Sequence, residues 1–136
     1  MKITKMNAMS AVACLTMGAA VATGSGCQRW TSNRPAAINH VVFFTLNDSS
    51  RTADLIADCD RRIAGIPGVE SYFCGRHVDT GRDSVDSNYD VGFYVGFDTF
   101  EDYARYVEHP EHKALVEDWR PHLREMLVRD VYDVTD

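Results

Sequence analysis

The stretch Ile38–Leu46 has the sequence INHVVFFTL, a run of β-branched and aromatic residues. Such residues favour a pleated strand, so we expect the first strand of the fold here. The next four residues, Asn47–Ser50, supply turn and N-cap groups. A stripe of apolar side chains at helical spacing then predicts a helix from about Arg51 to Ala64. The members of this stripe are Leu55, Ile56, Cys59 and Ile63.

The rest of the chain continues this alternation of strands and helices. Gly65 and the Pro67-Gly68 turn end the first helix. A second strand is expected over Val69–Thr80, a polar loop over Gly81–Asn88 and a third strand over Tyr89–Phe97. A second helix is expected to be capped by Asp98 and to run to about Val107, and a third helix to be capped by His109 and to begin at Pro110. The last expected element is a fourth strand over Met126–Val134.

This order of strand, helix, strand, strand, helical segment and strand is the ferredoxin-like βαββαβ arrangement. The predicted fold class is therefore α+β, with an antiparallel sheet that carries its helices on one face only. The other face of the strands remains rich in Val, Phe and Tyr. Packing of this face against a second copy of the chain would bury it, so we expect a homodimer.

The N-terminal segment has the order of residues that is typical of a secretory signal. Lys2 and Lys5 precede an uncharged run from Ala8 to Ala22, which is shorter than the roughly 20 residues that span a membrane. Two cleavage sites remain open: Ala20-Val21-Ala22 is an A-x-A site, and Gly24-Ser25-Gly26-Cys27 resembles a bacterial lipobox, although Gly24 stands where an aliphatic residue is expected.

We favour the second site. It predicts a lipoprotein-type signal peptide over residues 1–26, lipidation at Cys27, a linker over 27–37 and a folded domain over 38–134. The expected location is the cell envelope, with membrane contact only through the lipid anchor; with simple secretion the protein would be periplasmic or secreted.

The charge balance argues against nucleic-acid partners. The formal net charge is −6, and the only basic residues before Arg29 are Lys2 and Lys5. From Gln28 onward the chain carries 12 basic and 20 acidic residues, a net charge of −8. A surface of this sign repels phosphate backbones, so we expect no nucleic-acid binding.

Three local motifs resemble the Dabb family, the stress-responsive A/B barrel domains. They are Asn39–Phe44 (NHVVFF), which matches the opening H-V-V-x-F, Tyr89–Phe93 (YDVGF), which matches the start of the third strand, and Tyr106–His112 (YVEHPEH), which matches Y-x-x-H-P-x-H. Leu115-Val116 and Arg120-Pro121 also fit the family, and the resemblance covers residues 38–134. It implies a dimeric α/β barrel with a pocket; the N-terminal signal is an addition to it.

The resemblance also implies candidate site residues. One plant branch of the family contains a polyketide cyclase whose acid–base pair corresponds to His112 and Tyr106 in this sequence. His112 lies on the apolar stripe of the third helix, where a neutral imidazole could act as a general base, and Tyr106 could donate to a carbonyl oxygen. His40 and His109 are candidate ligand-binding residues. The same histidines could instead satisfy structural hydrogen bonds, with His109 capping a helix.

Two function classes follow. The first is an exported, homodimeric barrel that binds a small molecule without a reaction that the sequence can name. The alternative is a small lyase or cyclase acting on a polyketide-like carbonyl compound. No H-x-x-x-H, C-x-x-C or paired-carboxylate spacing is present, so we expect neither a metal nor a cofactor. Cys59 and Cys74 are the two cysteines of the folded part, and in an exported chain they are candidates for one disulfide, with two buried thiols as the alternative.

Overall fold

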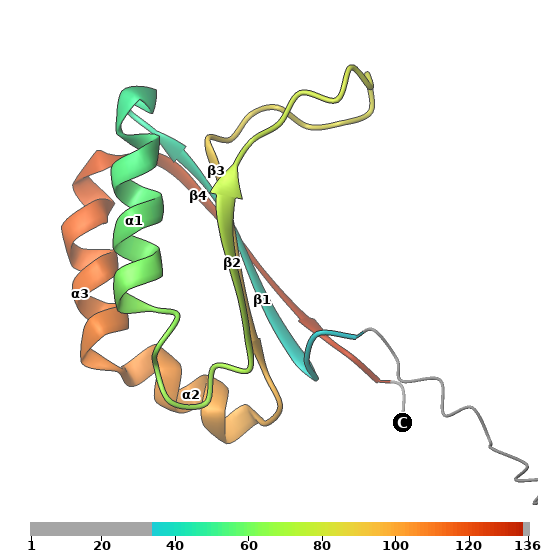
Figure 1. Ribbon diagram of the computed structural model, residues 1–136, viewed down its shortest axis with the longest axis vertical. Coiled ribbons are helices and arrows are strands. Elements are labelled where there is room, and N and C mark those ends of the chain that lie inside the picture. Colours follow the sequence, from blue (N-terminus) through green and yellow to red (C-terminus); the bar gives the residue numbers. More distant parts are fainter. Residues whose placement is uncertain (1–33, 135–136) are drawn as a thin grey trace, which may run out of the picture. The chain divides into compact units, whose positions relative to one another are not determined.

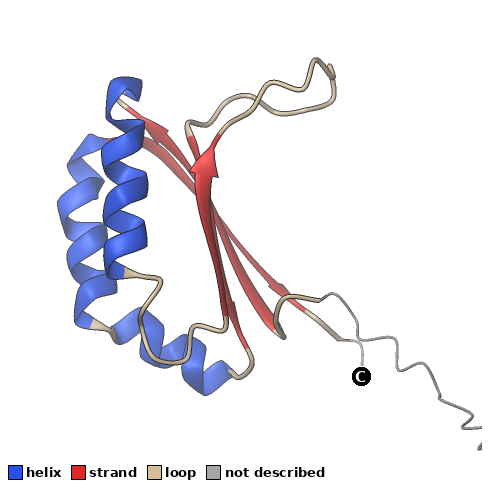
Figure 2. Cartoon of the chain, in the orientation of Figure 1, coloured by secondary structure: helices blue, strands red, loops and turns tan. Residues whose placement is uncertain are grey.

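An antiparallel sheet of four strands carries helices on one face and is open on the other (Figures 1 and 2). The computed structural model describes residues 34–134, and within them the strand order is β2-β3-β1-β4. The elements are β1 (Ile38–Leu46), the 3-10 turn η1 (Ser49–Arg51), α1 (Thr52–Arg62), β2 (Ser71–Arg76), β3 (Val91–Phe97), α2 (Phe100–Glu108), α3 (Pro110–Trp119), the 3-10 turn η2 (Arg120–His122) and β4 (Leu123–Tyr132). The predicted ferredoxin-like fold is confirmed.

The apolar run of β1 becomes the centre of the sheet. β1 pairs with β3 on one side and with β4 on the other. Its alternate residues Ile38, His40, Val42 and Phe44 are buried on the helix side. The helix side of β3 and the inner stripe of α1 complete the core, with Leu55, Cys59, Ile63, Val91, Val95 and Phe97 at 1% exposure or less.

Several predicted boundaries are wrong, among them the starts of β2 and β3, which lie at Ser71 and Val91. β2 ends at Arg76, four residues before the expected end, because its partner β3 begins only at Val91, which pairs with Arg76. The intervening loop, residues 77–90, projects away from the helices (Figure 1). β4 begins at Leu123, which directly follows η2 and pairs with Leu46 of β1. It ends at Tyr132, which pairs with Ile38, the first residue of β1.

The cap of α2 also differs from the prediction. The expected cap was Asp98, but Thr99 occupies the N-cap position and accepts a hydrogen bond from the Asp102 N–H at 3.1 Å. The Thr99 hydroxyl in turn hydrogen-bonds the Asp102 carboxylate. Thr99 and Asp102 hold the two positions of a capping box, one residue later than the sequence pattern indicated, but the Asp102 carboxylate accepts from the Thr99 hydroxyl and not from its backbone N–H.

Gly96 marks a close approach on the open face of the sheet, as interior strand glycines often do. A Cβ atom at this position would collide with the Ser71 hydroxyl and with Tyr94. The missing side chain leaves room for a small polar cluster, in which the Tyr94 hydroxyl donates to Asn39 Oδ1 at 2.9 Å and lies 2.9 Å from Ser71 Oγ.

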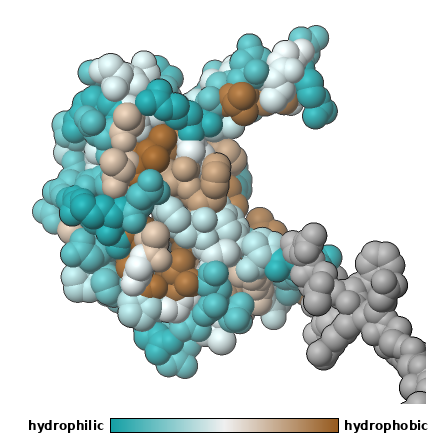
Figure 3. Space-filling view, in the orientation of Figure 1, coloured by the Kyte–Doolittle hydropathy of each residue, from teal (hydrophilic) through white to brown (hydrophobic). Residues whose placement is uncertain are grey.

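The surface seen in Figure 3 is mainly hydrophilic over the helices, with apolar residues showing between the helices and the sheet. No helix within residues 34–134 is both long and apolar enough to cross a membrane. The predicted signal peptide, the lipidation site Cys27 and most of the linker lie outside the described residues.

Candidate functional site

A pocket of about 270 Å³ lies between the sheet and the helices α2 and α3. Most of its lining is apolar, and it comes from β1, β3, β4, α2 and α3. Its polar lining residues are His40, Tyr103, Tyr106 and His112. A concave apolar surface with a few convergent polar groups is the usual form of a small-molecule site.

His40 is held by a carboxylate on the neighbouring strand. His40 and Asp130 are directly opposed in the antiparallel pairing of β1 and β4, and His40 Nδ1 lies 2.6 Å from Asp130 Oδ1. The Tyr103 hydroxyl donates to the other carboxylate oxygen at 3.0 Å. Because a carboxylate can only accept, His40 Nδ1 donates this hydrogen bond, and Nε2 has no hydrogen-bond partner among the described residues.

The Tyr103 phenol stays protonated in this arrangement. Burial raises the pKa of Tyr103, and the hydrogen bond to Asp130 raises it further. Asp130 therefore accepts hydrogen bonds from two side chains that line the pocket, and it fixes the orientation of both rings.

His112 is oriented by the turn between α2 and α3. His109 has extended backbone angles and accepts at Nδ1 from the Glu111 N–H, and Pro110 occupies the first turn of α3. This change of direction brings His112 Nδ1 within 3.0 Å of the Val107 carbonyl at the end of α2. The carbonyl only accepts, so the His112 proton is on Nδ1, and Nε2 is left as an acceptor.

Burial lowers the pKa of the His112 imidazole below its ordinary value, although the hydrogen bond to the Val107 carbonyl opposes this. The proximity of His40 lowers the pKa of His112 further. His112 is therefore neutral at pH 7, as a general base or a hydrogen-bond acceptor must be.

Tyr106 lies between the two histidines. Its side chain is 1% exposed, and its ring centroid lies 4.4 Å from that of His112 and 5.9 Å from that of His40. Burial raises the pKa of Tyr106 well above its usual range, so the phenol remains a donor. Its hydroxyl makes no hydrogen bond to another residue of the described part of the chain.

The structure thus brings together three of the four histidine and tyrosine candidates. His40, Tyr106 and His112 line one pocket, whereas His109 caps α3 and is not part of the lining. Sequence reasoning missed Asp130 and Tyr103. Asp130 lies on the last strand, and only the register of that strand against β1 places it directly opposite His40.

Cys59 and Cys74 are neighbouring free thiols in the structure. Cys59 is fully buried on α1, and Cys74 is half-buried on the helix side of β2. A hydrogen bond with Cys74 raises the pKa of the Cys59 thiol, and burial acts in the same direction. The pair is therefore close enough to interact, and the disulfide stays a prediction.

The fold and the motifs agree with comparisons to known proteins. The family model for Dabb, the stress responsive A/B barrel domain, matches residues 38–133. No curated protein sequence matches the chain. A Dabb family protein with a ferredoxin-like fold from Mesorhizobium loti is 29% identical, with a TM-score of 0.60, and the match covers 72% of this chain and 97% of that one.

Two further solved structures share the fold at lower identity. A dimeric ferredoxin-like protein of unknown function from Thermobifida fusca is 22% identical, with a TM-score of 0.60, over 71% of this chain and 90% of that one. A hydroxynitrile lyase from Passiflora edulis is 16% identical, with a TM-score of 0.62, over 75% of this chain and 98% of that one. Because the family model spans most of the sequence, the chain belongs to the Dabb family of stress responsive A/B barrel domains.

Proposed function

We propose that this protein is a homodimeric barrel that binds a small oxygen-bearing organic molecule in the pocket lined by His40, Tyr106 and His112. One observation carries the proposal. Two imidazole Nε2 atoms and one phenol hydroxyl have no hydrogen-bond partner in the described part of the chain, and they converge in a pocket whose remaining surface is mainly apolar. Solvent reaches these atoms in the open pocket, so a ligand that displaces the water must supply hydrogen-bond partners of its own.

The chemistry of the ligand follows from these three groups. His112 Nε2 is an acceptor and matches a hydroxyl or N–H donor, whereas Tyr106 is a donor and matches a carbonyl oxygen. The apolar lining, including Val42, Phe93 and Val128, favours a hydrocarbon body. A small ketone that also carries hydroxyl groups fits this pattern.

Isothermal titration calorimetry with 2,4-dihydroxyacetophenone tests the proposal. We expect wild-type protein to bind it, and we expect Tyr106→Phe and His112→Gln each to weaken binding about tenfold, the value of one buried hydrogen bond. Tyr132→Phe is the matched control, because Tyr132 is 55% exposed on β4 and lies outside the pocket lining. Equal affinities for all four proteins would refute the site.

The homodimer is part of the same proposal. The open face of the sheet presents Phe73 at 63% exposure, Val131 at 55% and Leu127 at 36%. Exposed apolar side chains gathered on one face of a sheet often mark an interface. Solved structures with this fold are described as dimeric, and the pocket lies on the other side of the sheet, so sheet-to-sheet pairing would leave it open.

A second candidate function is acid–base catalysis on a carbonyl compound. His112 Nε2 would remove a proton from the carbon next to the carbonyl, and the Tyr106 hydroxyl would donate a hydrogen bond to the oxygen on which the negative charge develops. The observation that favours it is the contact between the two rings, with centroids 4.4 Å apart. The name of the Passiflora edulis neighbour shows that this fold supports a lyase.

Proton exchange distinguishes catalysis from binding alone. In D₂O, a catalyst of this kind would speed deuterium incorporation into the methyl group of 2,4-dihydroxyacetophenone, followed by proton NMR. His112→Ala would abolish the acceleration, and His122→Ala, which changes an exposed histidine, would not. Exchange at the rate of buffer alone would leave the binding function and exclude this reaction for this ketone.

We also infer that the protein is exported and held at the cell envelope by a lipid on Cys27. Lys2, Lys5, the uncharged run Ala8–Ala22 and the small residues before Cys27 support this inference. Mass spectrometry of protein from a bacterial host would then show diacylglycerol on an N-terminal Cys27. A mature chain that retains residues 1–22 would contradict export, and cleavage after Ala22 would indicate simple secretion.

A further inference from the structure

We propose that the aromatic patch formed by Phe100 and Tyr132 rests on the surface of a lipid bilayer, beside the point where the N-terminal tether joins the domain. The patch lies outside the ligand pocket, whose lining contains neither residue. The proposal rests on the lipid at Cys27 and goes beyond it, because it states which surface of the anchored domain contacts the membrane.

Two exposed aromatic rings make up the patch. Phe100 begins α2 and is 65% exposed, and Tyr132 ends β4 and is 55% exposed. Their ring centroids lie 5.4 Å apart, with an angle of 30° between the ring planes. Val134, two residues after Tyr132, is 78% exposed. Single exposed apolar residues are common, but two rings that pack on each other and both stay mostly exposed form a continuous apolar surface.

Pairing of the open sheet faces would leave this patch exposed. Tyr132 is directly opposite Ile38 in the pairing of β1 and β4, and Ile38 is buried on the helix side of the sheet. Directly opposed residues of an antiparallel pair point to the same face. Tyr132 therefore lies on the helix side, where it contacts Phe100 of α2. A second copy bound through the open face does not reach it.

The N-terminal tether joins the domain at the patch. The Asp133 N–H donates to the Ala37 carbonyl at 2.7 Å, which extends the pairing of β1 and β4 by one step. Arg34 Nη1 lies 2.7 Å from Asp133 Oδ1, so this ion pair holds Arg34 beside the residue that follows Tyr132. The segment that leads from Cys27 to Arg34 thus enters the domain next to the two rings.

The length of this tether restricts how an anchored domain can turn. Arg34 is seven residues after Cys27, and seven fully extended residues span at most about 25 Å. A domain of about 100 residues has a radius of gyration of about 13 Å and measures roughly 35 Å across. The tether is therefore too short to reach around the domain, and the end that carries the patch faces the bilayer.

The chemistry of the patch suits the boundary between hydrocarbon and headgroups, where aromatic rings such as that of Tyr132 are favoured. Attraction to anionic lipids is weak here, because Asp98 is exposed and Glu101 is 80% exposed. The basic side chains of this end, Arg34 and Arg105, pair with carboxylates. The contact should therefore depend on apolar surface, form on zwitterionic lipids and persist in high salt.

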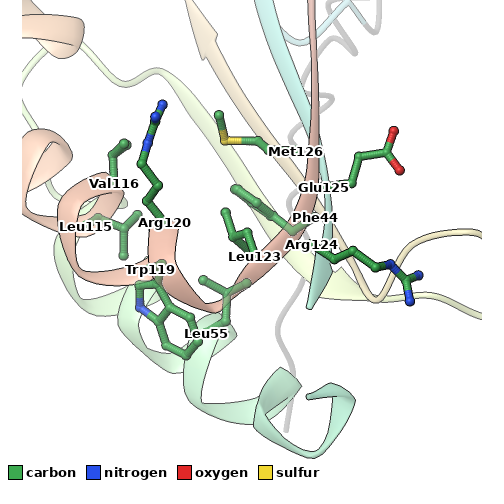
Figure 4. Close-up of a pocket in the computed structure, with 10 residues that line it drawn as sticks. All are labelled: Phe44, Leu55, Leu115, Val116, Trp119, Arg120, Leu123, Arg124, Glu125 and Met126. Carbon is green, nitrogen blue, oxygen red and sulfur yellow. The ribbon is translucent and has the colours of Figure 1, made fainter. Parts of the chain in front are cut away.

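Quenching of tryptophan fluorescence by brominated phosphatidylcholine tests the contact, because bromines in the acyl chains quench indoles that enter the bilayer. The lipidated protein is purified from a bacterial host and placed in vesicles of this zwitterionic lipid. Trp30→Phe removes one of the two native tryptophans. The other, Trp119, is 6% exposed, donates to Asp58 and lines the hollow in Figure 4 with Leu55, so it provides an unquenched background.

In this background, Phe100→Trp should lose emission when the vesicles are brominated. The loss should persist in about 1 M salt, where attraction between charges is screened beyond roughly 3 Å. Val78→Trp is the matched control and should keep its emission, because Val78 is 66% exposed in the loop at the other ends of β2 and β3. Adding Tyr132→Ser to Phe100→Trp should reduce the quenching, since one of the two rings is then gone.

The proposal is overturned by equal quenching of Phe100→Trp and Val78→Trp, by no quenching of either, or by quenching that disappears in high salt. If Phe100→Trp emission shifts to the blue with protein concentration in vesicle-free Cys27→Ser protein, the patch binds a second copy instead. Mass spectrometry of the vesicle sample separates the patch from the anchor. Lipid on Cys27 without quenching leaves the anchor and removes the patch, whereas Cys27 without lipid removes both and leaves binding in the pocket untouched.

Discussion

The rings of Tyr106 and His112 lie in contact across the junction of two helices, with centroids 4.4 Å apart. They belong to α2 and α3, and the extended backbone of His109 between them breaks the helical direction. One continuous helix would place residues six positions apart on different faces. The break at His109-Pro110 is therefore what makes a shared pocket out of these two side chains.

The Tyr106 hydroxyl should matter for binding and little for stability. Because the hydroxyl makes no hydrogen bond within residues 34–134, Tyr106→Phe should change the free energy of unfolding by less than about 1 kcal/mol. Tyr106→Ala, in contrast, should cost about 3–5 kcal/mol, since it removes a ring from the core. Urea unfolding measures both. A large loss in Tyr106→Phe would show that the hydroxyl is a structural group.

The folded protein should lose stability as His112 is protonated. Its pKa in the fold is lowered from 6.5, so between these two values the unfolded chain binds more protons and stability rises with pH. The contribution of His112 is thus complete above pH 6.5 and is lost as the pH falls through its folded pKa. His112→Gln should reduce the difference between the urea midpoints at about pH 7.5 and about pH 5.

His122→Gln is the control for this pH dependence, because His122 is exposed. It should leave the difference between the two midpoints unchanged. If His112→Gln behaves like His122→Gln, the burial of His112 does not oppose its protonation, and its role as a neutral acceptor at pH 7 loses its basis.

The open face of the sheet should hold the dimer together. Leu127→Glu and Phe73→Glu each place a charge on this face, where burial in an interface would be costly. Light scattering at micromolar concentration should give twice the chain mass for wild type and one chain mass for these variants. Val78→Glu is the control, since Val78 is 66% exposed in the loop after β2. A monomeric wild type would contradict the dimer.

Cys59 and Cys74 should form a disulfide in protein taken from an oxidising compartment. A hydrogen bond with Cys59 lowers the pKa of Cys74, so Cys74 supplies the attacking thiolate when an external disulfide is the oxidant. Closing this loop of roughly 15 residues should stabilise the protein by about 3 kcal/mol. Counting thiols in denatured, unreduced protein shows whether the disulfide forms. Two free thiols in the folded part would mean that Cys59 and Cys74 are core residues without a disulfide.

The order of elements followed from the sequence because the local signals agree with the tertiary structure. The apolar run Ile38–Leu46 is a central strand, and the helical stripe of Leu55 and Cys59 is buried as its spacing predicted. The ends of β2 and β4 could not be predicted from the sequence, because a strand ends where its pairing partner ends. The cap of α2 shifted by one residue since Asp98 and Thr99 are both good caps, and only the backbone decides between them.

The site was predictable only in part. The motif around His109-Pro110 pointed to Tyr106 and His112, but the dyad of His40 and Asp130 depends on the register of two strands that are about 90 residues apart in the chain. A further hollow, lined by Leu55, Trp119 and Leu123 where α3 and η2 face β4 (Figure 4), has no sequence signal, because Leu55 and Trp119 are core residues by any pattern. Their hollow arises from incomplete cover at an edge strand.

A crystal structure of the protein with 2,4-dihydroxyacetophenone would show whether this pocket is the binding site. We expect the ketone in the pocket between the sheet and α2 and α3, with its carbonyl oxygen within hydrogen-bond distance of the Tyr106 hydroxyl and one of its hydroxyl groups donating to Nε2 of His112. A ketone bound elsewhere on the domain, with this pocket filled by rearranged side chains, would contradict this assignment.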